Sequence, residues 1–195
     1  MLALLCPTDP SWTDGVERDL DGLLRDHAHC EIKAAQSALS LVARFGAEDP
    51  DLVAPLVALA HEETEHFREV HDRIRARGGV MSHPGSDEYV ASLRRAAGAD
   101  RDPQQDPLLD RLLVSALVEA RSCERFKLLS ERLGDASLRA FYRELMASEA
   151  KHFRLFARLA EERFGQEATH ARLEALARRE AAVAEKLPLG PTVHG

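Results

Sequence analysis

The sequence predicts an all-α protein built on four long helices arranged as two consecutive hairpins. Three observations predict it. Apolar residues recur with helical spacing over four long stretches, no stretch alternates as a strand would, and the joints between the stretches are short, long and short in that order. The 195 residues suffice for one domain with its own core, so we expect a single domain over residues 1–195.

The first hairpin is expected over residues 12–77. Its first helix spans roughly 12–45 and ends in "RFGAEDP", where Gly46 would cap it. The second follows Pro50, spans roughly 51–77 and ends at the "GG" of residues 78–79. The predicted buried stripes are Leu20, Leu24, His27, Glu31, Ala34, Ala38, Leu41 and Phe45, then Leu52, Leu56, Leu59, Glu63, His66, Val70 and Ile74.

The second hairpin repeats this plan over residues 107–164. One helix spans roughly 107–133 and ends at Gly134, and the next spans roughly 136–164 and ends at Gly165. The predicted buried stripes are Leu109, Leu112, Ala116, Glu119, Cys123, Phe126, Ser130 and Leu133, then Leu138, Tyr142, Leu145, Glu149, His152, Phe156 and Leu159.

A long crossover and a C-terminal extension complete the plan. Residues 78–106 connect the hairpins and contain a possible short helix at 87–97. Residues 166–195 hold an amphipathic helix at roughly 168–187, expected to pack outside the first four, and an irregular tail. Short joint, long crossover, short joint is the connectivity of a ferritin-like four-helix bundle.

The two hairpins share a motif. "ETEHFR" at 63–68 and "EAKHFR" at 149–154 both follow the frame Glu-x-x-His-Phe-Arg, and each lies on the second helix of its hairpin. The first helix of each hairpin has one glutamate on its buried stripe, Glu31 in the first hairpin and Glu119 in the second. We interpret this as an internal duplication.

These acidic residues lie where apolar residues are expected. A buried, unpaired carboxylate costs several kcal/mol or more, so a partner must neutralise it. Residues three apart lie on one helix face, so each Glu-x-x-His can bind one ion. Carboxylate and imidazole suit iron or manganese. The sequence predicts two metal ions bound by Glu31, Glu63, His66, Glu119, Glu149 and His152, with no catalytic residue beyond the metal centre.

The third long helix offers both Glu119 and Glu124, and height along the bundle favours Glu119. At about 1.5 Å rise per residue, Glu149 lies roughly 20 Å from the joint at residues 134–135, Glu119 roughly 21 Å and Glu124 roughly 14 Å. Glu119 is therefore level with Glu149. Glu124 would then support the site from behind or form a salt bridge.

Two further residues lie beside the predicted ligands. His27 lies one turn before Glu31 and would orient a ligand, with a hydrogen-bonded core histidine as the alternative. Cys123 lies one turn after Glu119 and would line an oxygen or substrate pocket, with plain packing as the alternative.

Charge and cysteine content limit the function classes. The net charge of −7 argues against a general nucleic-acid coat, and the densest basic region is Arg73, Arg75 and Arg77 with Arg94, Arg95 and Arg101. The alternative interpretation of this basic region is a solvated helix end. No stretch is long and apolar enough to span a membrane, and the start lacks a signal peptide's features. Three widely spaced cysteines fit a cytoplasmic setting.

Five segments together carry a family resemblance. They are "LLCPTDPSW", "DHAHCEIKAAQSALSL", "HEETEHF", "ALVEARSCERF" and "ASEAKHF", within residues 4–160. The sequence resembles the bacterial tRNA 2-methylthio-N6-isopentenyladenosine hydroxylase family. The C-terminal 30 residues match this pattern less clearly.

The resemblance implies a non-haem di-iron monooxygenase acting on the prenyl group of the modified adenosine at position 37 of tRNA. It implies two iron ions, O2 as co-substrate, and an external electron donor such as a reductase or ferredoxin. The partner would be the tRNA anticodon loop, contacted by Arg73, Arg75, Arg77, Arg94 and Arg95. We expect a monomer or dimer.

Other functions compete with this one. A ferritin-like hydroxylase or oxidase acting on a lipid or small molecule, as in ubiquinone biosynthesis, would use the same metal centre. Iron oxidation and storage would require a cage of many subunits. A rubrerythrin-like peroxidase would usually carry a CxxC pair, which this sequence lacks. A purely structural bundle would bind no metal.

Overall fold

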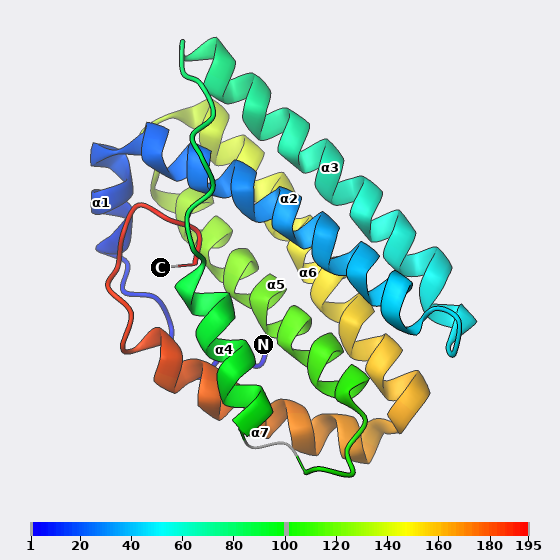
Figure 1. The fold of residues 1–195 in the computed structure, drawn as a ribbon. Coiled ribbons are helices and arrows are strands. Elements are labelled where there is room, and N and C mark those ends of the chain that lie inside the picture. Colours follow the sequence, from blue (N-terminus) through cyan, green and yellow to red (C-terminus); the bar gives the residue numbers. More distant parts are fainter. Residues whose placement is uncertain (1, 100–101, 195) are drawn as a thin grey trace. The chain divides into compact units, whose positions relative to one another are not determined.

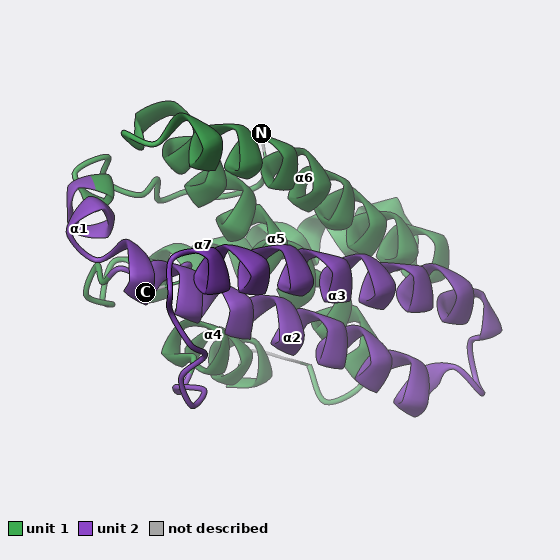
Figure 2. Cartoon of the chain, turned by 90° about the horizontal axis from the view of Figure 1, so that it is seen from above, with its two compact units in different colours: residues 1–13, 87–190, 194–195 green, residues 14–86, 191–193 purple. Residues whose placement is uncertain are grey.

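The computed structural model describes residues 2–99 and 102–194, and within these ranges it contains seven α-helices, one short 3-10 helix and no strand. The predicted all-α class is confirmed (Figure 1). The chain divides into two compact units, which Figure 2 colours separately. The prediction of one domain over the whole chain stays a prediction.

Unit 2 consists of residues 14–86 and 191–193 and contains the first hairpin. Helix α2 (Leu20–Phe45) packs along α3 (Val53–Ala76), and the 3-10 helix η1 (Pro50–Leu52) lies in the joint. Gly46 ends α2 with an ordinary helical φ of −66°. A Cβ there would lie 2.6 Å from the Val42 carbonyl oxygen and 3.0 Å from Val53, so close approach, and not a left-handed φ, requires glycine.

The first predicted helix is two helices. Helix α1 (Trp12–Arg18) ends before Asp19, which has φ −142° and accepts a hydrogen bond from the Gly22 amide to cap α2. The prediction of one continuous helix over 12–45 was therefore wrong at this point. An aspartate that caps a new helix interrupts the backbone without interrupting the apolar pattern.

Unit 1 consists of residues 1–13, 87–190 and 194–195 and contains the second hairpin. Helix α5 (Pro107–Arg132) packs along α6 (Ala136–Phe164). Asp106 caps α5 through the Leu108 amide, and Asp135 caps α6 through the amides of Ser137 and Leu138. Both predicted helices are confirmed, with ends that differ from the expected ones by one residue at most.

Two further helices cover this hairpin. Helix α4 (Glu88–Ala99) lies in the crossover, and α7 (Gln166–Ala184) follows α6 after Gly165, whose φ of +83° suits only glycine. Helix α7 packs against α4, α5 and α6. The predicted short crossover helix and the C-terminal helix are confirmed. None of the helices within the described ranges combines the length and apolar character needed to span a bilayer.

A buried ionic cluster ties α7 and α4 to α5. Arg121 of α5 donates to Glu180 of α7 at 2.6 Å, and the Tyr89 hydroxyl of α4 donates to the same Glu180 oxygen at 2.8 Å. Arg121 also donates to the Cys6 carbonyl, at 2.9 Å. Arg121, Glu180 and Tyr89 are essentially inaccessible to solvent. Burial, followed by the charge of Glu180, raises the pKa of Tyr89 well above its usual value, so the phenol stays a donor.

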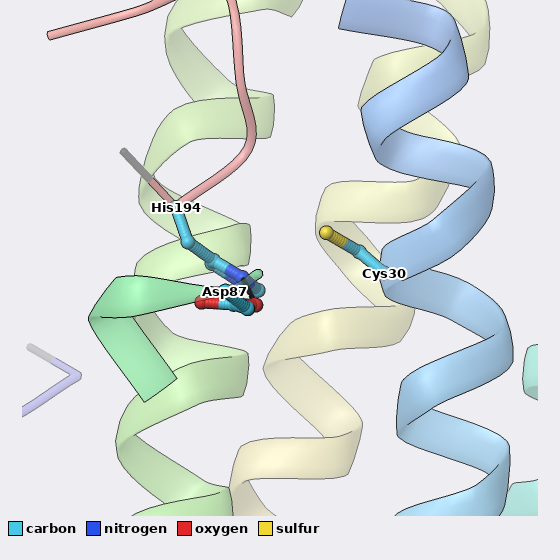
Figure 3. Close-up of side chains that lie close together, drawn as sticks. All are labelled: Cys30, Asp87 and His194. Atoms are coloured by element: carbon cyan, nitrogen blue, oxygen red, sulfur yellow. Dashed lines mark hydrogen bonds and ion pairs between the residues drawn. The ribbon is translucent and has the colours of Figure 1, made fainter. Parts of the chain in front are cut away.

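The C-terminal tail is irregular, as predicted, but it is anchored. The Trp12 indole donates to the Gly190 carbonyl at 2.8 Å within unit 1. His194 is buried, stacks on Tyr89 and forms a hydrogen bond with Ser122 at 3.0 Å. It also forms a hydrogen bond with Asp87 at 3.2 Å, and Figure 3 shows these two side chains together. Within unit 2, the Val193 amide donates to Asp26 of α2 at 2.7 Å. The tail is therefore part of the packed structure.

Candidate metal centre

Each unit contains one buried cluster of two glutamates and a histidine. In unit 2, Glu31 of α2 faces Glu63 and His66 of α3, with exposed fractions of 4%, 1% and 8%. The His66 Nδ1 lies 3.2 Å from Glu63 Oε2 and 3.7 Å from Glu31 Oε2. One oxygen or nitrogen of each residue lies within 4.8 Å of the others, a spacing that one metal ion could bridge. We call this group the α2–α3 cluster.

The second cluster has the same composition in unit 1. Glu119 of α5 faces Glu149 and His152 of α6, with exposed fractions of 6%, 2% and 2%. The His152 Nδ1 lies 3.8 Å from Glu149 Oε2 and 4.0 Å from Glu119 Oε2. We call this group the α5–α6 cluster. The sequence pattern therefore brings three predicted ligands together in each unit.

Electrostatics in the α2–α3 cluster favour charged side chains. Burial alone would raise the pKa of Glu31, but hydrogen bonds from His27 and His66 outweigh it and hold the pKa well below its usual range. Burial alone would lower the pKa of His66, but hydrogen bonds to Glu31 and Glu63 outweigh it and raise the pKa to about 10. The imidazolium thus balances the carboxylates.

His27 contacts one predicted ligand directly. Its Nε2 lies 2.6 Å from Glu31 Oε1, one helical turn further along α2, and the side chain is inaccessible to solvent. Because an ionised carboxylate only accepts hydrogen bonds, the His27 Nε2 must carry the donated proton. This geometry is what the predicted orienting role requires.

Glu124 lies in a different environment from Glu119. Its two oxygens accept from the Thr8 amide at 2.6 Å and the Thr8 hydroxyl at 2.7 Å, and Arg121 donates to it at 3.0 Å. Glu124 therefore anchors the N-terminal segment to α5. Of the two carboxylates, Glu119 is the one that approaches His152.

Cys123 is buried and donates to the Met146 carbonyl of α6 at 3.3 Å. This contact packs α5 against α6 and matches the packing alternative. Burial raises the pKa of the Cys123 thiol to about 11. Cys6 and Cys30 are partly exposed.

We expect Cys123 to resist alkylation at pH 8, because the thiolate is the reactive form and with a pKa near 11 roughly one molecule in a thousand carries it. Its reaction rate with iodoacetamide should rise about tenfold per pH unit up to about pH 11. Peptide mass spectrometry of the folded protein, with Cys6 and Cys30 as internal references, measures this. Equal labelling of all three thiols at pH 8 would contradict it.

The predicted basic residues lie at the surface, and several have acidic neighbours. Arg77 donates to Asp21 at 2.7 Å, Arg73 lies 3.7 Å from Glu69, and Arg95 lies 3.6 Å from Glu88. Arg75 and Arg94 are exposed. Arg101 lies outside the described residues. The predicted arginines therefore fall into two sets, one at the end of α3 and one on α4.

Three residues without a predicted role, Arg121, Thr8 and His194, form contacts on or beside helix α5. The sequence contains one signal that Arg121 is buried and paired. Helix α5 is apolar around most of its circumference, so an arginine in its middle must be buried and paired. No local pattern identifies Thr8 or His194, because their partners are more than 70 residues away.

The helical fold and these buried carboxylate–imidazole clusters define the class of protein. The fold is ferritin-like, and the clusters are compatible with a di-iron site. The model of the tRNA-(MS2IO6A)-hydroxylase (MiaE) family matches residues 1–195, and the chain belongs to this family.

Two relatives agree with this membership, and one solved structure has a similar fold. The chain is similar to the tRNA 2-(methylsulfanyl)-N(6)-isopentenyladenosine(37) hydroxylases of Pseudomonas putida and Salmonella typhimurium. The Pseudomonas putida protein is 39% identical, and the match covers 89% of this chain and 82% of that protein. The Salmonella typhimurium protein is 30% identical, and the match covers 82% of this chain and 75% of that protein. The solved structure of protein 43 with aldehyde deformylating oxygenase activity from Synechococcus matches with a TM-score of 0.90 and 39% identity, covering 98% of this chain and 95% of that chain.

Proposed function

We propose that this protein is an O2-dependent monooxygenase that hydroxylates the isopentenyl group of 2-methylthio-N6-isopentenyladenosine at position 37 of tRNA. The observation that carries the proposal is the pair of buried glutamate–histidine clusters in a chain of this hydroxylase family. Relatives of 39% and 30% identity bear the name of this reaction.

Two iron ions are the proposed cofactor, held by Glu31, Glu63, His66, Glu119, Glu149 and His152. The donor set fits, because four buried carboxylates need positive charge and two divalent ions supply it. The metals would supply the activation of O2, which neither carboxylate nor imidazole can perform.

The proposed reaction balances when an external donor supplies two electrons. One oxygen atom of O2 enters a terminal allylic C–H bond of the prenyl group and forms the alcohol. The other atom leaves as water, using two electrons and two protons. The proposed source of the two electrons is an electron-transfer protein of the reductase or ferredoxin type.

The side chains around the clusters would serve this chemistry in two ways. The glutamates and histidines are at least nine-tenths buried, which keeps bulk water away from the reacting carbon. His27 and Glu31 form a hydrogen bond that holds one carboxylate in place before substrate arrives.

Recognition of tRNA is proposed to rely on local positive charge despite the net charge of −7. A prenylated base can be extruded from the anticodon loop and brought to the site, while arginines contact phosphates of the stem. The candidates are Arg73, Arg75, Arg77, Arg94 and Arg95. A cytoplasmic location, where tRNA is modified, completes the proposal.

Arg75 gives a direct test of this surface. The Arg75→Glu variant should raise the KM for tRNA roughly three- to tenfold, because one phosphate contact is lost and a repulsion is added. Turnover of the free modified nucleoside should not change. Arg158→Glu, on an exposed arginine of α6, is the matched control. Identical KM values for the two variants would exclude Arg75 from the interface.

A second function has one specific observation in its favour. The solved structure that matches 98% of this chain is named for aldehyde deformylating oxygenase activity. The same metal ligands would serve an oxygenase that acts on an apolar aldehyde, which is the small-molecule alternative. Iron storage has no comparable support.

One experiment separates these functions. The full chain, reconstituted anaerobically with iron and then reduced, is given 18O2 with either prenylated tRNA or a long-chain aldehyde. We expect the tRNA nucleoside to gain one 18O atom and the aldehyde to remain, with His152→Ala as the inactive control. Aldehyde loss without any change in the tRNA would replace the proposed function by the second one.

A further inference from the structure

The two clusters have the same ligands but different neighbours. Glu31 has His27 one turn before it, 2.6 Å from its Oε1 and fully buried. The residue one turn before Glu119 is Ser115, which is partly exposed. The two hairpins therefore share the glutamates and histidines but not this imidazole.

The clusters also differ in compactness. His66 Nδ1 lies 3.2 and 3.7 Å from the two carboxylates of the α2–α3 cluster, and His152 Nδ1 lies 3.8 and 4.0 Å from those of the α5–α6 cluster. The cluster that contains the extra histidine is the tighter one. The hydrogen bond from His27 leaves Glu31 Oε2 as the oxygen that faces His66.

We propose that His27 is a positioning residue that makes the two metal positions inequivalent, so that the α2–α3 cluster binds the first divalent ion and binds it more tightly. This inference rests on the proposed metal site. A carboxylate already held through one oxygen loses less rotational freedom when its other oxygen binds a metal.

Cobalt(II) titration of the metal-free full chain, followed by visible absorption, tests the inference without relying on activity. We expect two binding steps in the unsubstituted protein, the tighter one differing at least tenfold from the weaker. His152→Ala should keep the tight step, whereas His66→Ala should keep the weak one. Two equal steps would overturn this inference while leaving the metal site intact; no metal uptake would overturn both.

Substitution of His27 in these two backgrounds gives the decisive comparison. Adding His27→Ala to His152→Ala should weaken the remaining step by about 10- to 100-fold. Adding it to His66→Ala should leave the remaining step unchanged. An equal loss in both backgrounds would overturn the positioning role.

A conservative variant protects the test from a general folding defect. His27→Gln keeps an N–H donor near Glu31 and should recover most of the cobalt affinity that His27→Ala loses. Ser115→Ala is the matched control in the other cluster and should change neither step. If His27→Gln binds cobalt no better than His27→Ala while both variants melt cooperatively, the hydrogen bond is not what tightens the site.

Discussion

Replacing Glu119 with alanine is expected to remove at least one of the two proposed iron ions and to reduce hydroxylation by at least a thousandfold. Glu119 is buried and its carboxylate faces His152, so the variant loses one of three ligands in the α5–α6 cluster. Iron per chain, measured by emission spectroscopy after anaerobic reconstitution, and nucleoside mass spectrometry of treated tRNA both follow this change.

Glu124→Ala is the matched control, five residues further along the same helix. Its carboxylate accepts from Thr8 and Arg121 and anchors the N-terminal segment. We expect this variant to keep both iron ions but to lose about 1–3 kcal/mol of folding free energy, because buried donors lose their acceptor. If Glu124→Ala loses the iron and Glu119→Ala keeps it, the assignment of the ligand on α5 is reversed.

Replacing Glu180 with alanine should destabilise the protein by about 3–5 kcal/mol, the usual cost of removing one member of a buried ion pair. Among the described residues, Arg121 then keeps only Glu124 as an acidic partner. Arg121 is essentially inaccessible to solvent and donates to Glu180 through both Nε and Nη2, at 3.0 and 2.6 Å. The Tyr89 hydroxyl would lose its acceptor as well. Urea unfolding followed by circular dichroism measures the loss.

Two further variants show whether the buried charge causes the effect. Glu174→Ala removes an exposed partner of Arg178 on the same helix and should leave the unfolding midpoint unchanged. Combining Glu180→Leu with Arg121→Met removes both charges and should recover much of the stability that Glu180→Ala loses. A midpoint for Glu180→Ala equal to that of Glu174→Ala would mean that the cluster does not hold α7 in place.

Most of the helices and the candidate ligands could be predicted because their signals are local. A stripe of apolar residues with 3.6-residue spacing identifies a buried face without knowledge of what covers it. Glu63 and His66 lie three apart on such a stripe, and so do Glu149 and His152, so their burial and mutual approach follow from helix geometry alone. Helix rise likewise placed Glu119 level with Glu149. In the structure, Glu119 Oε2 lies 4.0 Å from Nδ1 of His152, the histidine of the same motif.

The break at Asp19 shows a limit of that reasoning. Leu20 and Leu24 continue the apolar spacing, so the pattern does not reveal where one helix stops and the next begins. The side chain of Asp19 decides the matter by capping α2 through the Gly22 amide. A cap is an interaction of a single residue, and periodicity averages over many.

The helical class, the two hairpins and the two glutamate–histidine motifs on buried faces follow from the sequence, because each depends on residues within one or two helical turns. Packing in three dimensions is needed to show that Glu124 anchors Thr8, that Arg121 pairs with Glu180, and that His194 forms hydrogen bonds with Ser122 and Asp87. Those partners lie between 59 and 116 residues apart in the chain. Periodicity shows that a polar side chain is buried; only packing shows which group satisfies it.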